Sequence, residues 1–223
     1  MIVSIHVPKT AGKSFRLRLA AAYGSRLLED YADWVGYDPP ESHARSAAEA
    51  RGRREQLQRD YDVIHGHFIA DKYAGLFLRT DLVAFFRDPC QQAVSHYEFL
   101  MRHPEIAHPG VTAFHDLQPT LPEFIAALPS FQSMFLGSVA VGDLAVVGLT
   151  EQFERGIALF ETVFGCKLPQ EAERGNVNPH RAGDRYPIEP AVRRAIDIHR
   201  AADVELYRRA CDRFARLAAR HGV

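Results

Sequence analysis

The segment near the start of the chain that could do chemistry is Pro8-Lys9-Thr10-Ala11-Gly12-Lys13-Ser14-Phe15, which combines lysines, hydroxyl side chains and a glycine. It follows the apolar run Ile2–Val7 and precedes an amphipathic stretch, as a turn between a strand and a helix would. The first N–H groups of a helix have no intrahelical partner and carry partial positive charge, so they can bind anions. Lys9 and Lys13 add full positive charges. The segment therefore predicts a site for a polyanion.

The same segment departs from the loop of nucleoside triphosphatases. That pattern needs a glycine five residues before Gly12, and Val7 stands there. Strand–turn–helix junctions also occur throughout α/β proteins, and most of them bind nothing. A junction without a ligand is therefore the alternative that the tripeptide Gly12-Lys13-Ser14 alone leaves open.

Polar residues also end two later apolar runs. Asp62–His67 ends with His65 and His67, and Leu82–Arg87 ends with Arg87. Ligands of open parallel sheets gather at the carboxyl ends of strands, so we expect these side chains near the lysine-bearing segment. The two histidines could instead form a metal pair or be structural. No third metal ligand is close in sequence, so no metal is expected.

The chain after Arg87 predicts a helix that starts at Asp88-Pro89 and runs to about Arg102. Aspartate is a good N-cap, and proline suits the first helical position. Alone, Arg87 could be an ion-pair partner of Asp88 or Glu98. Cys90 falls in the first turn of this helix, where a thiol pKa can fall, but a small core or surface residue is the simpler interpretation.

Short buried strands alternate with helices, which predicts an α/β fold with a central parallel sheet flanked by helices. The expected strands are Ile2–Val7, Asp62–His67, Leu82–Arg87 and Leu144–Leu149. The expected helices are 13–23, 43–58, 89–102, 121–128, 131–136, 151–164 (capped by Thr150) and 189–218. The expected loops are 25–40, which is rich in aromatic residues, 103–119 and 165–190.

Length and composition limit the possible classes of protein. The chain has 223 residues with a formal net charge of −1, so we expect one domain over residues 1–223 and no nucleic-acid partner. Its three cysteines do not form a disulfide framework, which favours a reducing compartment. No targeting segment and no apolar run long enough to span a membrane is visible, so a soluble, cytoplasmic protein is expected.

Several motifs resemble those of one known family. Ile5–Phe15 resembles the 5′-phosphosulfate loop of the sulfotransferases that act on carbohydrates, the family of the heparan sulfate and chondroitin O-sulfotransferases. Phe85–Pro89 followed by Ala93–Tyr97 resembles that family's 3′-phosphate motif. His65-Gly66-His67-Phe68 is similar to the segment of that family that carries a proposed catalytic base. Val147–Glu151 also resembles a segment of the same family. The likeness covers residues 2 to about 155.

The resemblance implies a nucleotide-kinase-like, P-loop type of three-layer fold and the donor 3′-phosphoadenosine 5′-phosphosulfate (PAPS). Arg87 and Ser95 would bind the 3′-phosphate of the donor. The donor loop would comprise Lys9, Thr10, Ala11, Gly12, Lys13, Ser14 and Phe15. Relatives usually have Thr, Ser or Gly at the position of Lys13, so the role of this lysine stays open.

The resemblance also implies transfer of the sulfuryl group to a hydroxyl of a saccharide or another alcohol, without a metal. Lys9 would stabilise the leaving group, and His67, in preference to His65, would act as general base. The alternatives are an ATP-dependent small-molecule kinase and an inactive nucleotide-binding protein. The sequence indicates neither the acceptor nor the oligomeric state, and Asn176 and Asn178 could close over the adenosine.

Overall fold

The computed structural model describes residues 1–170 and 185–223. Within these residues, five strands form one sheet in the order β2-β3-β1-β4-β5, and every neighbouring pair is parallel. The strands are β1 (Ile2–Ile5), β2 (Leu27–Asp30), β3 (Val63–Gly66), β4 (Asp81–Phe86) and β5 (Val146–Leu149). The predicted α/β class with a central parallel sheet is thus confirmed.

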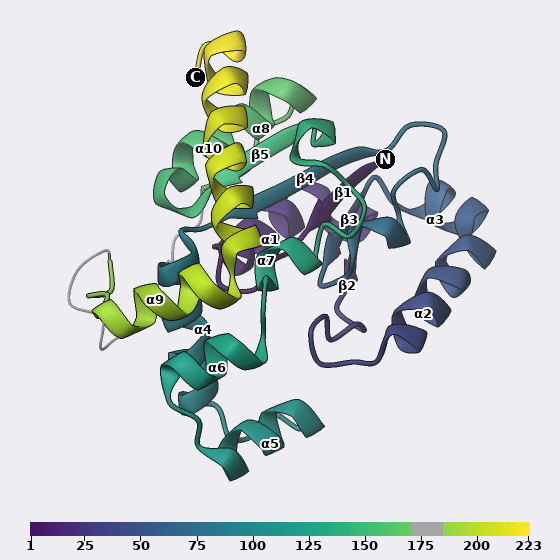
Figure 1. Ribbon diagram of the computed structural model, residues 1–223. Coiled ribbons are helices and arrows are strands. Elements are labelled where there is room, and N and C mark those ends of the chain that lie inside the picture. The colour runs from purple at the N-terminus through teal and green to yellow at the C-terminus, as the bar shows by residue number, and fades with distance from the viewer. Residues whose placement is uncertain (171–184) are drawn as a thin grey trace.

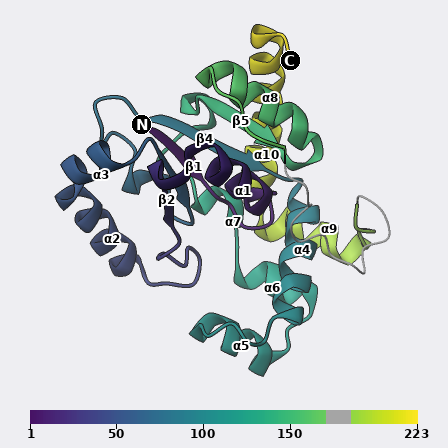
Figure 2. The ribbon, with the colours of Figure 1, turned by 180° about the vertical axis from the view of Figure 1, so that it is seen from behind.

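Helices cover both faces of the sheet. α1 (Gly12–Tyr23) and α8 (Phe153–Phe164) lie on one face, and α10 (Ala201–His221) with the short α7 (Phe131–Met134) lies on the other (Figure 1 and Figure 2). α2 (Pro40–Gly52) and α3 (Arg54–Asp60) lie at the side of the sheet where β2 is the edge strand (Figure 1). A second group gathers beyond one end of the sheet (Figure 1 and Figure 2): α4 (Pro89–Arg102), α5 (Pro109–Leu117), α6 (Leu121–Ala127) and α9 (Pro190–His199).

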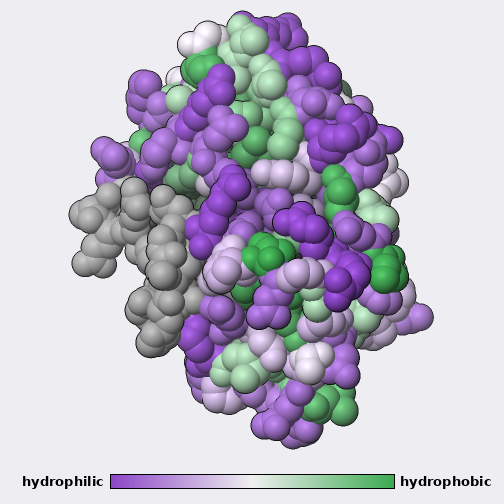
Figure 3. All heavy atoms as spheres, turned by 60° about the vertical axis from the view of Figure 1, so that its left-hand side comes forward, coloured by the Kyte–Doolittle hydropathy of each residue, from purple (hydrophilic) through white to green (hydrophobic). Residues whose placement is uncertain are grey.

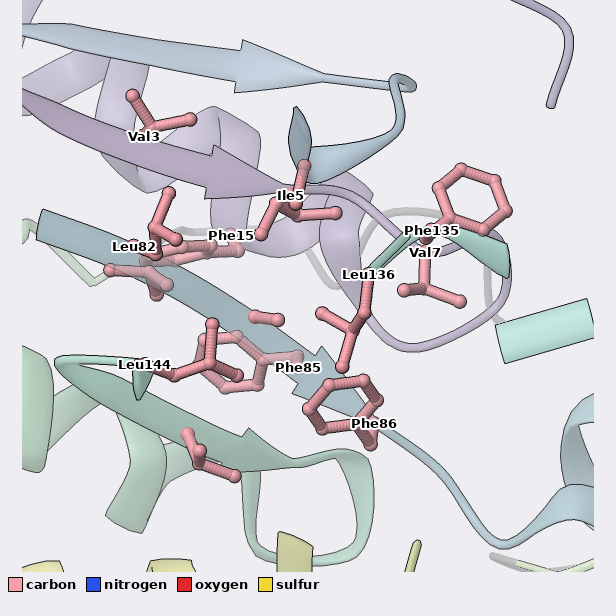
Figure 4. Close-up of a cluster of buried hydrophobic side chains, with 14 of the residues drawn as sticks. Val3, Ile5, Val7, Phe15, Leu82, Phe85, Phe86, Phe135, Leu136 and Leu144 are labelled. Atoms are coloured by element: carbon pink, nitrogen blue, oxygen red, sulfur yellow. The ribbon is translucent and has the colours of Figure 1, made fainter. Parts of the chain in front are cut away.

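One part of the core forms between α1, α8 and the sheet. Phe15 of α1 is buried, and its ring centroid lies 4.9 Å from that of Phe85 in β4 (Figure 4). Phe85 in turn fills the space beside Gly148, where a Cβ atom would lie 2.3 Å from the Phe85 ring. Burying a phenylalanine side chain contributes about 2–3 kcal/mol. This packing fixes the height of α1 over the sheet and therefore the turn that precedes it.

Two predicted loops contain secondary structure. β2 lies inside the expected loop 25–40, and α5 lies inside the expected loop 103–119, so both predictions are wrong at these places. β2 is a four-residue edge strand with the sequence Leu-Leu-Glu-Asp, which has no strand pattern of its own. Its pairing with β3 holds it in place, and only the folded chain provides that pairing.

Two long predicted helices are each divided in two. The expected helix 43–58 consists of α2 and α3, which meet at Arg53, and the expected helix 189–218 consists of α9 and α10, which meet at Arg200. Arg200 is fully buried, with φ −126° and ψ 31°, so the break lies inside the protein. Thr150 does not cap α8; its hydroxyl donates to the carbonyl of Phe86, 3.1 Å away, and so joins β5 to β4.

Hydrophilic residues cover most of the face shown in Figure 3, with hydrophobic residues in smaller groups between them. Among the helices of the described residues, none combines the length and the apolar character that crossing a membrane requires.

Candidate functional site

A cavity of about 580 Å³ lies at the carboxyl ends of β1, β3 and β4. This volume is within the usual range for small-molecule sites, about 300–1,000 Å³. The three strands are neighbours in the sheet, so the residues that follow them converge there. The sequence-predicted residues that line the cavity are Lys9, Ala11, Gly12, Lys13, Ser14, His67, Arg87 and Ser95.

The turn between β1 and α1 has an unusual backbone. Lys9 and Ala11 both have positive φ angles, 69° and 66°, in the left-handed region that costs roughly 1–2 kcal/mol per non-glycine residue. Ala11 is the N-cap of α1 and offers no side-chain hydrogen bond, and the first turn of α1 contains no acidic residue. The amides at the start of this helix therefore remain available to an anion.

Only glycine fits at position 12, because another side chain lies directly against its Cα atom. A Cβ atom at this position would lie 1.8 Å from Cδ2 of His6, so the imidazole of His6 packs directly against the glycine. The turn is also closed from within, because the hydroxyl of Thr10 donates to the carbonyl of Val7, 2.8 Å away. Thr10 is buried and does not line the cavity, and neither does the core residue Phe15. These two predicted residues shape the loop with their side chains.

The tips of β1 and β4 are joined by a direct contact. Nη1 of Arg87 donates to the carbonyl oxygen of Lys9 at 3.3 Å. The backbone of Arg87 is held in turn by Gln132 of α7, whose amide oxygen accepts from Arg87 N at 3.1 Å and whose amide nitrogen donates to Arg87 O at 2.8 Å. The two candidate anion-binding groups therefore lie at one place, and a buried side chain fixes the second of them.

Helix α4 adds the third part of this end of the cavity. Asp88 caps it as predicted, because its carboxylate accepts from the amide of Gln91 at 3.0 Å. Ser95 lines the cavity from this helix. One turn further on, the ring of Phe99 lies under Lys9, with 4.3 Å between Nζ and the ring centroid. A cation–π contact of this kind stabilises the ammonium by roughly 0.5–2 kcal/mol.

The charge around Lys9 is strongly positive. Burial first, and then the positive charges of Arg102, Arg87 and Lys13, together lower the pKa of Lys9 to about 8. The side chains of all four line the cavity. Like charges gathered in a partly buried space repel one another, and a bound anion relieves that repulsion.

Three histidine rings meet at the tips of β1 and β3. The centroid of His6 lies 4.5 Å from that of His67 and 5.1 Å from that of His65. Burial lowers the pKa of His67 to about 4 and that of His65 to about 3, so both rings are neutral near neutral pH. His65 is buried, pairs through Nδ1 with the hydroxyl of Ser4 at 2.8 Å, and does not line the cavity, whereas His67 does.

Several cavity residues were not identified from the sequence as members of the site. They are chiefly His6, His96, Phe131, Phe135 and Tyr186. The sequence favours the segments 25–40 and 102–120 as the lining of an acceptor cleft, and Tyr31, Trp34 and Tyr37 of the first segment do line the cavity. The position of His6 two residues before Pro8 was a usable signal. Residues 131 and 135 gave no such signal, because only the fold brings α7 to the tip of β4. Asn176 and Asn178 lie outside the described residues.

The part of the chain that the structure describes contains no group of three or more His, Cys, Asp or Glu side chains placed to hold a metal ion. The histidine rings described above therefore carry no argument for a metal centre.

Comparisons with known proteins add no relative to this picture. No family model matches the chain, and a search of curated proteins finds no match.

Proposed function

We propose that this protein is a PAPS-dependent O-sulfotransferase with a P-loop-like donor site. One observation carries the proposal: Arg87 and Lys9, from the tips of neighbouring strands, are in hydrogen-bond contact and line one cavity. PAPS carries anionic groups at both the 5′ and the 3′ position of one adenosine. A site for it needs two cationic groups at a short, fixed separation, and the two strand tips supply them.

The 5′ end of the donor fits the turn before α1. The amides of Gly12, Lys13 and Ser14 would bind the 5′-phosphate, with the hydroxyl of Ser14 and the ammonium of Lys13 beside it. At the other end, the guanidinium of Arg87 and the hydroxyl of Ser95 would bind the 3′-phosphate, since arginine presents its donors as a planar fork that matches phosphate oxygens. Four cationic side chains, Lys9, Lys13, Arg87 and Arg102, line this cavity, which favours an anionic ligand; burial and these neighbouring charges together lower the pKa of Lys9.

The chemistry needs one proton acceptor and one stabiliser of negative charge. The acceptor hydroxyl oxygen forms a bond to sulfur while the bond from sulfur to the bridging phosphate oxygen breaks. The hydroxyl proton passes to a ring nitrogen of His67, which is neutral because burial lowers its pKa to about 4. The electron pair of the broken bond remains on the phosphate oxygen, where the ammonium of Lys9 stabilises it. Positioning and charge stabilisation would supply most of the rate enhancement, as in phosphoryl transfer.

Thermal unfolding with three nucleotides tests the proposal. We expect 3′-phosphoadenosine 5′-phosphate (PAP), the product form of the donor, to raise Tm by several degrees, with smaller shifts for AMP and for ATP with Mg²⁺. A larger shift with ATP and Mg²⁺ would favour a kinase. If none of the three nucleotides shifts Tm and PAPS supports no sulfation, the result favours the alternative of an inactive protein and overturns the proposal. Arg59→Ala, at an exposed arginine outside the cavity, is the charge-matched control and should respond like the wild type.

A further inference from the structure

One part of the cavity lining differs from the cationic end. We call it the aromatic wall: Tyr31, Trp34, Val35, Tyr37, Phe131 and Phe135. The first four come from the segment between β2 and α2, and the last two come from α7 and the residue that follows it. The two segments touch at Gly36, where φ is +88° and a Cβ atom would lie 3.3 Å from the Phe131 ring.

Two rings of the wall contact the proposed general base, His67. The centroid of His67 lies 4.8 Å from that of Tyr31 and 6.2 Å from that of Phe135. Phe135 lies 5.5 Å from Phe131, which contacts His96 at 4.8 Å. A molecule that presents a hydroxyl to His67 would therefore place the rest of its skeleton against aromatic rings.

The wall carries no cation. Neither the segment 31–37 nor α7 contains a lysine or arginine, and the one carboxylate among their cavity residues, Asp33, is paired with Lys72 at 3.1 Å. The cations among the described cavity residues belong to the turn between β1 and α1, the first turns of α1, the tip of β4 and α4. One of them, Arg16, is paired with Glu29 at 2.9 Å. An anionic acceptor chain would find no counter-charge along this wall.

The two tyrosine hydroxyls of the wall are engaged within the protein. The hydroxyl of Tyr31 pairs with Nδ1 of His6 at 2.9 Å, and that of Tyr37 with Nε2 of His96 at 3.4 Å. Among the described residues that line the cavity, Nε2 of His67 and Nδ1 of His96 are buried with no hydrogen-bond partner. A sugar with many hydroxyls would leave most of them unpaired here, which is costly, whereas an acceptor with a single hydroxyl would not.

We propose that the acceptor is an uncharged phenol or aromatic alcohol with one reacting hydroxyl. This inference rests on the proposed sulfotransferase function and specifies its acceptor. The ring of the acceptor stacks on the wall, its hydroxyl reaches His67, and it needs no cation beyond those that hold the donor. Aromatic pairs favour this packing in offset or edge-on geometry.

Trp34 provides a direct test of binding. It is the one tryptophan of the chain, it lines the cavity, and one of its faces is covered by the ring of His108, 4.0 Å away. We expect para-propylphenol, added to the full chain with PAP, to change Trp34 fluorescence saturably, and methyl glucoside and chondroitin to leave it unchanged. Saturable binding of chondroitin without any response to para-propylphenol would overturn the inference.

Turnover provides the second test. With PAPS, we expect para-propylphenol sulfate to form with a kcat/KM at least about tenfold above that for methyl glucoside or chondroitin. Trp34→Ala should raise KM for the phenol about tenfold while the Kd for PAP stays constant, and Trp34→Phe should restore most of the loss. The unchanged Kd for PAP shows that the variant is folded.

Donor binding separates the two proposals. If calorimetry shows PAP binding and chondroitin is the better acceptor, or no phenol sulfate forms, the acceptor class is overturned and the donor assignment stands. If PAP does not bind and PAPS supports no transfer, the proposed function fails and the acceptor class fails with it.

Discussion

The side-chain amide of Gln92 donates to the carbonyl oxygen of Pro8 at 3.1 Å, and this bond ties α4 to the turn before α1. The other end of the same amide accepts from Nη1 of Arg200 at 3.0 Å. Gln92 is fully buried, and the bond to Arg200 lies inside the protein, whereas the bond to Pro8 is part-buried at the cavity. The junction of α9 and α10, far away in sequence, therefore supports the loop that is expected to bind the donor.

Gln92→Leu should weaken donor binding through this support. The substitution removes both hydrogen bonds and leaves a buried carbonyl and a guanidinium N–H unpaired, so we expect a loss of about 1–3 kcal/mol in stability. The Kd for PAP should rise about tenfold because the Pro8–Lys9 turn is less well held. Calorimetry at a temperature where the variant is folded measures this. Gln92→Glu keeps the acceptor for Arg200 and loses the donor to Pro8. An unchanged Kd in both variants would show that the bond does not position the loop.

Gly12→Ala should destabilise the protein because of His6. The new methyl group would overlap the imidazole, and overpacking of this kind costs typically about 1–3 kcal/mol. The double variant His6→Ala/Gly12→Ala should recover part of that loss, since the space of the ring becomes available. Chemical denaturation of the four proteins gives the coupling energy. Strictly additive effects would contradict the steric explanation.

His67→Gln should remove catalysis and keep the donor. General-base groups contribute typically about 10²–10⁴-fold, so we expect kcat to fall within that range while the Kd for PAP stays the same. His65→Gln is the matched control from the same strand end, because His65 does not line the cavity. Its expected effect is on stability, through the bond to Ser4. Equal losses of kcat in the two variants would contradict the role of His67.

Activity should fall on the alkaline side because of Lys9. Burial lowers the pKa of Lys9 from 10.5 to about 8, so the charged form that stabilises the leaving group is lost as the pH rises through about 8. The negative donor stabilises the ammonium, so the decline in kcat should begin at higher pH than the decline in kcat/KM. Lys9→Arg should be slower but should lack this alkaline decline, since a guanidinium stays charged. A profile with the same decline in Lys9→Arg would assign it to another group.

Much of the fold could be predicted from local sequence. β1, β4 and β5 are runs of buried apolar residues, and Asp88-Pro89 starts a helix by local chemistry alone, so these elements are where the sequence predicts them. The edge strand β2 and the break at Arg200 depend on tertiary contacts, with β3 in one case and with Gln92 in the other. No pattern in a single segment contains that information.

The site likewise contains some residues that local sequence could predict and others that depend on tertiary packing. Lys9 and Arg87 could be placed at one edge because each follows the carboxyl end of a predicted parallel strand, and Ser95 was expected beside them from the resemblance; all three line the cavity. Of the aromatic wall, the part from residues 31–37 follows from the aromatic character of that segment, but the contribution of Phe131 and Phe135 could not be foreseen, because they reach it only through the packing of α7.

The most direct test of the account compares the binding of PAP and AMP, which differ by the 3′-phosphate alone. Calorimetry on the wild type should give a Kd for PAP about a hundredfold below that for AMP, since a charge-assisted contact to a phosphate contributes roughly 1.5–3 kcal/mol and Arg87 and Ser95 both supply contacts. Arg87→Ala should remove most of this difference by weakening PAP alone, while Arg59→Ala should keep it. Equal affinities for PAP and AMP in the wild type would contradict the claim that the tips of β1 and β4 hold the two ends of one nucleotide.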